Sequence, residues 1–129
     1  GQTVEVREHQ FLAATGGVDD TGLRGKGSAN CRRGGTGFFI DRFHAARGEG
    51  IVWLNGYGNV FEVTLAAGES IDVEPGAWVY KDPGVGMETQ FQKLSTGLFA
   101  SAGQLAWNRF TGPGRLGIQS MSLHLPTAE

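Results

Sequence analysis

The segment RFTGPGRLGIQS, residues 109–120, combines glycine, proline and arginine as an anion-binding loop would. Backbone N–H groups of such a loop can hold a phosphate. The same residues also suit a strand-connecting turn, because Pro113 fits the second position of a type II turn and Gly114 supplies the positive φ of the third. A Walker phosphate loop is excluded, since Lys26 in LRGKGS lacks the first glycine and the Ser or Thr of that motif. We predict a turn, with a binding loop as the alternative.

A second candidate site is the basic, glycine-rich stretch of residues 22–33. No acid interrupts its four cations between Thr21 and Ile40, and an acidic partner or a lipid headgroup could dock there: Arg24, Lys26, Arg32 and Arg33. A solvated loop is the plainer interpretation. Because glycine and arginine stand where the later part of the chain has apolar residues, we expect residues 19–33 to be exposed or mobile.

Metal and nucleophile chemistry have little support. The three histidines form no pair at metal-binding spacing with each other or with Cys31, the only cysteine: His9, His44 and His124. The segment GESIDVEPGAWVYKD, residues 68–82, is similar to a cupin strand, but no histidine follows its Pro-Gly. No G-x-S-x-G elbow occurs either. We expect no catalytic residue, no metal and no cofactor, and therefore a protein that is not an enzyme.

Two arginines follow apolar rows on predicted strands. By strand alternation, Arg109 shares a face with Trp107, and Arg42 ends the row of residues 38–40. We predict that each lays its stem on the core and keeps its guanidinium at the rim, where Trp107 would add a cation–π contact. Burial against carboxylates and a symmetric subunit contact are the alternatives.

The elements that would position these residues are short strands. Helical periodicity is nearly absent, and short alternating apolar runs are bounded by glycine, proline, aspartate or asparagine. This pattern predicts an all-β fold, either a sandwich or a barrel. The expected strands are residues 3–6, 10–14, 38–43, 51–55, 59–65, 70–73, 77–81, 104–110, 116–119 and 121–125.

An internal repeat organises those strands. Shifted by 67 positions, GQTVEVREHQFLAATGGV at the start of the chain falls on GESIDVEPGAWVYKDPGV, residues 68–85, and Arg42-Phe43 falls on Arg109-Phe110. After a three-residue deletion, Gly50 falls on Gly114. We predict one domain, residues 1–129, of two repeats, 1–67 and 68–129. The strand before Gly68 has no counterpart before Gly1, as expected of a fragment of a longer protein.

The composition limits the classes of partner. A net charge of −2 argues against a surface built to neutralise nucleic-acid phosphates. No apolar run approaches the length of a transmembrane helix, and the N-terminus has no signal pattern. With one cysteine, no internal disulfide can form. We expect a soluble, cytoplasmic protein with 22 glycines serving many tight turns.

With the repeat, the RFTGPG-x-x-x-IQS block and the L-x-x-GE-x-x-x-V-x-PGA-x-V block, the chain resembles the mitochondrial-biogenesis family named for altered inheritance of mitochondria. The resemblance implies a duplicated β-sandwich, like the tryptophan RNA-binding attenuation protein and related to double-stranded β-helix folds. The family brings no catalytic motif, and its eukaryotic members are linked to inner-membrane organisation and respiratory-complex assembly.

From the resemblance we expect a non-enzymatic assembly or scaffold protein that forms homo-oligomers through strand edges or apolar faces. The alternative is a ligand- or RNA-binding module that uses the basic stretch of residues 22–33.

Overall fold

The computed structural model describes residues 1–21, 40–92 and 105–121, and its regular elements there are all strands. Among these residues, no helix is long and apolar enough to span a membrane. The strands are β1 (Thr3–Arg7), β2 (Phe11–Ala14), β3 (Val18–Asp20), β4 (Ile40–Ala45), β5 (Val52–Leu54), β6 (Val60–Leu65), β7 (Ser70–Val73), β8 (Trp78–Lys81), β9 (Gly86–Gln92), β10 (Leu105–Thr111) and β11 (Gly114–Gln119). The predicted all-β fold class is confirmed.

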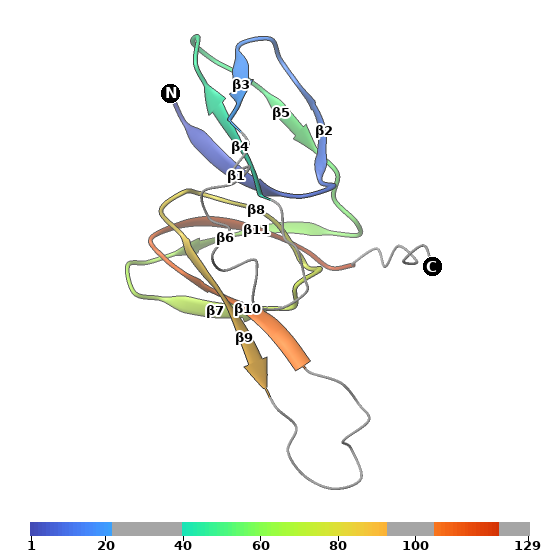
Figure 1. The fold of residues 1–129 in the computed structure, drawn as a ribbon, viewed down its shortest axis with the longest axis vertical. Helices are drawn as coiled ribbons and strands as arrows, with labels where there is room; N and C mark the ends of the chain where they lie inside the picture. The colour runs from blue at the N-terminus through green and yellow to red at the C-terminus, as the bar shows by residue number, and fades with distance from the viewer. Residues whose placement is uncertain (22–39, 93–104, 122–129) are drawn as a thin grey trace, which may run out of the picture.

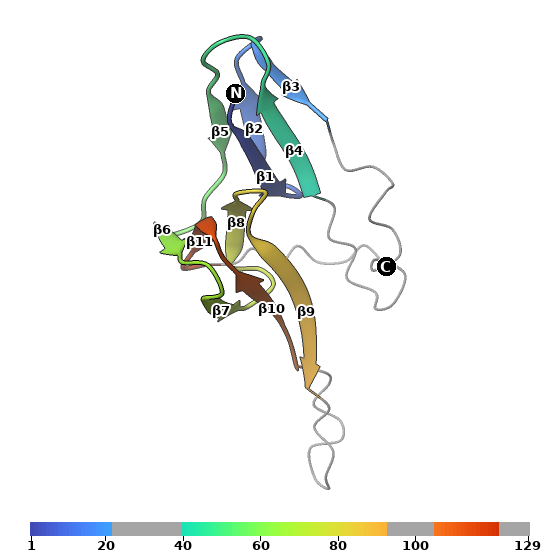
Figure 2. The ribbon, with the colours of Figure 1, turned by 90° about the vertical axis from the view of Figure 1, so that its left-hand side faces the viewer.

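The strands form three antiparallel sheets (Figures 1 and 2). A six-stranded sheet has the order β3-β4-β1-β8-β11-β6, and a three-stranded sheet has the order β7-β10-β9. Within the described ranges, β2 and β5 form a two-stranded sheet of their own. We call β1 to β5 the first half and β6 to β11 the second half. The pairing of β1 with β8 joins the two halves into one sheet.

The main core lies in the second half, between the β8-β11-β6 part of the large sheet and the three-stranded sheet. Its central residues come from both layers, and Trp78 and Phe110 are fully buried with ring centroids 5.6 Å apart. The other buried members are Leu65, Val73, Val85 and Leu116. This sandwich packing follows from strand alternation, which turns one face of each sheet inward.

The two halves pair their strands in the same register. On β1 and β4, Glu5 lies opposite Arg42, and 67 positions later, on β7 and β10, Asp72 lies opposite Arg109. The pairing of β2 with β5 is likewise repeated by that of β8 with β11, including a bulge in each. We use "counterpart" for the residue reached by adding 67 as far as His44 and 64 from Gly48 onward.

Most strand predictions are confirmed within a few residues, and two strands were not predicted. Residues 18–20 form β3, whose exposed acidic residues give no apolar alternation, and residues 86–92 form β9. Asp19 and Asp20 are exposed, as expected, but belong to a strand. The rest of the stretch expected to be mobile, residues 22–33, and most of the strand expected at 121–125 lie outside the described residues.

The segment with Pro113 joins β10 to β11. The Gly112–Pro113 peptide bond is cis and Gly114 has a φ of 140°, so the connection differs from the type II turn we predicted, in which that bond is trans. Its backbone donors are used within the fold. The Gly112 N–H donates to the Glu69 carbonyl at 2.9 Å, and the Arg115 N–H donates to the Asp82 carboxylate at 2.8 Å. These two groups are therefore not free for a phosphate.

Candidate functional site

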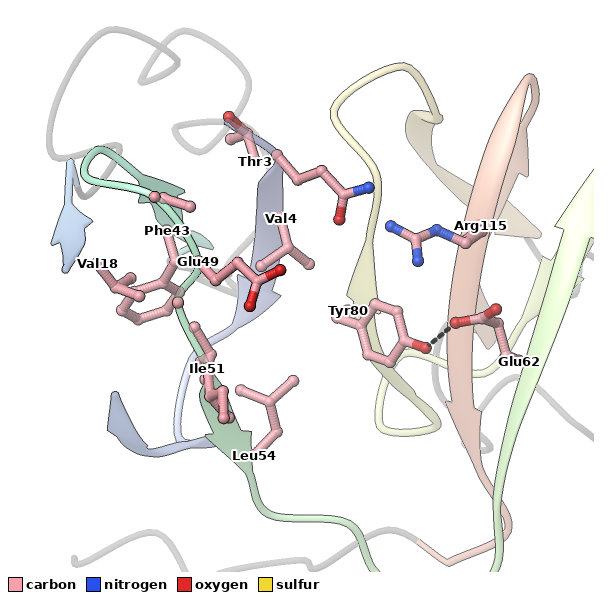
Figure 3. Close-up of a pocket in the computed structure, with 15 residues that line it drawn as sticks. Thr3, Val4, Val18, Phe43, Glu49, Ile51, Leu54, Glu62, Tyr80 and Arg115 are labelled. Carbon is pink, nitrogen blue, oxygen red and sulfur yellow. Dashed lines mark hydrogen bonds between the residues drawn. The ribbon is translucent and has the colours of Figure 1, made fainter. Parts of the chain in front are cut away.

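A pocket of about 660 Å³ opens between the first half and the outer face of the large sheet (Figure 3). We call it the first-half pocket. Its apolar wall belongs to the first half, where β1, β4 and β5 turn side chains inward, and its polar wall comes from β6, β8 and β11 of the second half. The apolar wall is built mainly of Val4, Val18, Phe43, Ile51, Val52 and Leu54, and the polar wall of Glu62, Tyr80 and Arg115.

The apolar wall occupies the position that a closed core has in the second half. The counterparts of Val4, Val18, Phe43, Val52 and Leu54 are the core or core-packed residues Ile71, Val85, Phe110, Leu116 and Ile118. In the second half, β6 pairs with β11 and adds Val63 and Leu65 to that core. Within the described residues, the first half has no strand on the corresponding edge of β5. The pocket is thus the interior of the first half, left open along β5.

An aromatic pair in each half shows the same difference in burial between the two halves. Phe11 stacks on Phe43 with centroids 4.8 Å apart, and their counterparts are the packed pair Trp78 and Phe110. Trp78 is 0% exposed, whereas Phe11 is 41% exposed. The ring contact is present in both halves, but only the second half covers it.

Tyr80 and Glu62 are joined to each other in the polar wall of the pocket. The Tyr80 hydroxyl donates a short hydrogen bond to the Glu62 carboxylate, as Figure 3 shows. Burial and this hydrogen bond to Glu62 raise the pKa of Tyr80 to about 12. The phenol is therefore neutral at ordinary pH and serves as a hydrogen-bond donor.

Arg115 is held at the pocket rim by Asp82. Its Nε and one terminal nitrogen each donate to the Asp82 carboxylate at 3.0 Å. Burial works against ionisation of Asp82, but the hydrogen bonds from the Arg115 side chain and backbone outweigh it and lower the pKa of that carboxyl. The pair anchors the guanidinium and leaves the Arg115 side chain 43% exposed.

A buried charge cluster connects the two halves beside the pocket. Glu5 on β1 accepts hydrogen bonds from Lys81 on β8 and from Arg42 on β4, and Lys81 also donates to the Val85 carbonyl at 2.8 Å. Glu5 and Lys81 are almost fully buried. Because a buried charge is costly without a partner, this cluster favours the one register in which β1 and β8 satisfy each other.

The two arginines singled out in the sequence each pair with a carboxylate on the neighbouring strand. Arg42 bonds Glu5, and Arg109 bonds Asp72 through two hydrogen bonds of 2.7 and 2.8 Å. The planar Arg109 guanidinium meets the carboxylate directly opposite it on β7, and its cation–π contact with Trp107 stays a prediction. The Asp72 and Arg109 side chains are about half exposed, whereas that of Glu5 is buried.

Of the remaining sequence candidates, Pro113 and Gly114 lie in the connection between β10 and β11 and do not line the first-half pocket. The four basic residues of the glycine-rich stretch lie outside the described residues: Arg24, Lys26, Arg32 and Arg33. Within the part of the chain that the structure describes, no three His, Cys, Asp or Glu side chains gather in a group able to hold a metal.

The pocket was missed because its walls come from strands distant in sequence. Tyr80, Glu62 and Arg115 carry no motif, and apolar residues such as Val4 look like ordinary core positions.

Comparison with known proteins bears on the family and the fold. Residues 1–121 match the family described as mitochondrial biogenesis AIM24. The crystal structure of protein SPYM3_0169 from Streptococcus pyogenes is similar, with a TM-score of 0.63 and 20% sequence identity over 94% of this chain and 50% of that chain. At this identity the likeness concerns the fold alone, and the chain spans about half the length of that protein. No curated protein matches the chain significantly.

Proposed function

Since the chain belongs to the mitochondrial biogenesis AIM24 family, we propose that it is a non-enzymatic, self-associating β-rich scaffold of the cytoplasm. The observation that carries the proposal is the apolar surface of the two-stranded sheet. Four large apolar side chains on or beside β2 and β5 are exposed by 41–62%: Phe11, Leu12, Ile51 and Trp53. Large exposed apolar residues that gather on one element are typical of an interaction site.

Open strand edges support the same proposal. Within the described residues, β2 and β5 pair only with each other, so each presents one edge with unpaired backbone groups. An added strand would satisfy these groups and cover the apolar side chains beside them. Both features favour a protein partner over a small substrate.

An internal duplication would explain why these surfaces are left open. We propose that the halves are copies of one unit, as the matching registers of β1 with β4 and of β7 with β10 suggest. The second copy has β6 beside β11 and β1 beside β8, whereas β5 and β2 lack such neighbours among the residues that the structure describes. The strand edges and apolar side chains of β2 and β5 that remain uncovered in the first copy are then available for assembly.

The non-enzymatic part of the proposal rests on the polar groups of the first-half pocket. Tyr80 holds its proton until about pH 12 and is tied to Glu62, while Arg115 is tied to Asp82. Groups held in these pairs stabilise the sheet and are poorly placed to exchange protons with a substrate near neutral pH.

The proposal is tested by the native mass of the full chain. We expect light scattering coupled to size-exclusion chromatography to give a defined multiple of 13.7 kDa that persists on dilution to micromolar concentration. A monomer at every concentration, together with no partner recovered by the intact protein, would contradict the scaffold function.

A second candidate is a ligand-binding module, favoured by the volume and mixed lining of the first-half pocket. A pocket of about 660 Å³ is within the usual size of small-molecule sites. An apolar dye should gain fluorescence on binding there, and Val4→Trp should abolish that gain by filling the apolar wall. The matched control is Glu88→Trp, at an exposed position of β9 that does not line the pocket, and it should show the same gain as the parent protein.

The nucleic-acid form of this candidate uses the basic stretch of residues 22–33 in the manner of the attenuation protein. Its test is the Arg32→Ala/Arg33→Ala double variant, in which RNA binding should weaken and its dependence on salt should fall. Unchanged affinity would remove the stretch from consideration.

A further inference from the structure

The two halves of the chain join through one pair of strands, β1 and β8. The two strands at the corresponding positions of the halves each have an edge that no described strand pairs with. In the existing junction, β1 pairs antiparallel with β8, with Glu5 opposite Lys81 and Val6 opposite Tyr80. The counterpart of β1 is β7, and the counterpart of β8 is β2. Within the described residues, β7 pairs only with β10 and β2 only with β5, so one edge of each remains open.

We propose that β7 of one copy of this chain adds antiparallel to β2 of a second copy, repeating the junction between β1 and β8. The counterpart register places Asp72 opposite Ala14 and Val73 opposite Ala13. This inference rests on the proposed self-association and names the two edges that carry it. A contact of this kind is head-to-tail, since each copy offers a different edge on each side, and it closes into a ring or continues as a chain of copies.

The two edges do not meet within one molecule. Figures 1 and 2 both place β2 in the upper part of the molecule and β7 in the lower part, with the large sheet between them. Pairing of the two edges therefore needs a second copy.

The burial of side chains on β8 indicates how far side chains on β2 would be buried if a strand were added to its open edge. Val79 on β8, which has neighbours on both edges, is 2% exposed, while its counterpart Leu12 on β2 is 62% exposed. Phe11 is 41% exposed, against 0% for its counterpart Trp78. A strand added to the open edge of β2 would cover the backbone and side chains along that edge, as β1 does along the edge of β8.

The charges at the proposed contact are compatible with it. In the existing junction, Glu5 needs Lys81 because both are buried. In the proposed contact their counterparts are Asp72, which already has a two-bond partner in Arg109, and Ala14, which carries no charge. No carboxylate would be buried without a partner, so the contact avoids the main cost of burying charge.

Leu12→Asp is the first test, because Leu12 lies at the proposed contact and is exposed in the single chain. The matched control is Phe61→Asp on β6. Phe61 is 53% exposed in the single chain and lies outside the proposed contact. We expect the native mass of Leu12→Asp to fall to one chain at concentrations where the parent protein and Phe61→Asp remain oligomeric. Circular dichroism should show the same fold in all three.

The outcomes separate this inference from the proposed function. An oligomer that survives Leu12→Asp unchanged would overturn the β7–β2 contact while leaving a self-associating scaffold in place. A parent protein that is monomeric throughout would overturn both. Loss of the oligomer in Phe61→Asp but not in Leu12→Asp would move the interface to β6 and overturn the contact proposed here.

The register is tested by cross-linking two single-cysteine proteins, each made with Cys31→Ser. Directly opposite residues of an antiparallel pair have Cβ atoms about 4.5–5.5 Å apart, within reach of a short thiol cross-linker. A mixture of Ala14→Cys and Asp72→Cys should give a cross-linked heterodimer, whereas Ala14→Cys with Thr64→Cys should not. Equal yields in the two mixtures would overturn the register.

Discussion

At the scale of single residues, the same ion pair occurs twice in different surroundings. Glu5 with Arg42 and Asp72 with Arg109 have corresponding positions on corresponding strands, but Glu5 is buried with Lys81 at the junction of the halves, whereas Asp72 is half exposed. Solvent screens an exposed pair, and removal of one member of a buried pair leaves the other without compensation. Position in the fold, and not residue type, decides what each pair contributes to stability.

We therefore predict that Glu5→Ala destabilises the protein by about 3–5 kcal/mol, because it leaves the Lys81 ammonium buried without its carboxylate. Asp72→Ala, the same change at the counterpart position, should cause a much smaller loss. Urea unfolding of both variants measures the difference. Equal losses would show that the junction cluster is no more important than the exposed pair.

Tyr80 provides a prediction at alkaline pH. Its pKa is raised from an ordinary 10.0 to about 12 in the folded chain, so the fold favours the neutral phenol. The stability that this contributes is complete below about pH 10 and is lost as the pH rises through about 12. Tyr80→Phe should remove this part of the alkaline loss, as measured by urea unfolding at about pH 8 and about pH 11. Tyr57→Phe is the control, and an identical decline in both variants would contradict the assignment.

At the scale of elements, close backbone approach fixes the connection between β10 and β11. A Cβ at Gly112 would lie 2.3 Å from the Ala66 carbonyl oxygen and 2.7 Å from that of Leu65. Both are backbone atoms next to the turn that leads into β7, and they cannot move aside as a flexible side chain would. The glycine is thus required for packing at this point.

Gly112→Ala should accordingly destabilise the protein by about 1–3 kcal/mol through overpacking. Gly16→Ala is a suitable control, since a Cβ there would meet nothing within 4 Å. Thermal unfolding should separate the two variants. If both unfold at the parent temperature, the approach of Gly112 to Ala66 is looser than the structure indicates.

Strand positions were largely predictable, since alternation of apolar residues is a local signal. The strands β7 and β8 begin and end within one residue of the expected ranges. The strand β9 was missed because its alternate residues Glu88 and Gln90 are polar, and the residues between and beside them include both apolar and polar types. The first-half pocket could not be predicted from local pattern, because Val4 and Tyr80 come to line one pocket only through strand pairing between the two halves.

At the scale of the whole molecule, the two halves differ in how completely they are closed. The second half has six strands, with β6 beside β11, and a buried core around Trp78 and Phe110. The first half has five strands in the part of the chain that the structure describes, and its interior lines a pocket of about 660 Å³. The pairing of β1 with β8 and the Glu5 cluster connect the less closed half to the more closed one.

The edge of β5 that no described strand covers has a consequence for the time course of backbone opening. Amide groups exchange hydrogen with solvent through local openings, which need less free energy where few apolar contacts are lost. We predict that amides of β2 and β5 exchange before those of β8 and β11, although the two strand pairs share a register. The amides of β1 should exchange at the slow rate of β8, with which β1 pairs. Exchange followed by mass spectrometry would resolve the two rates. Uniform protection would mean that the chain opens only as a single unit.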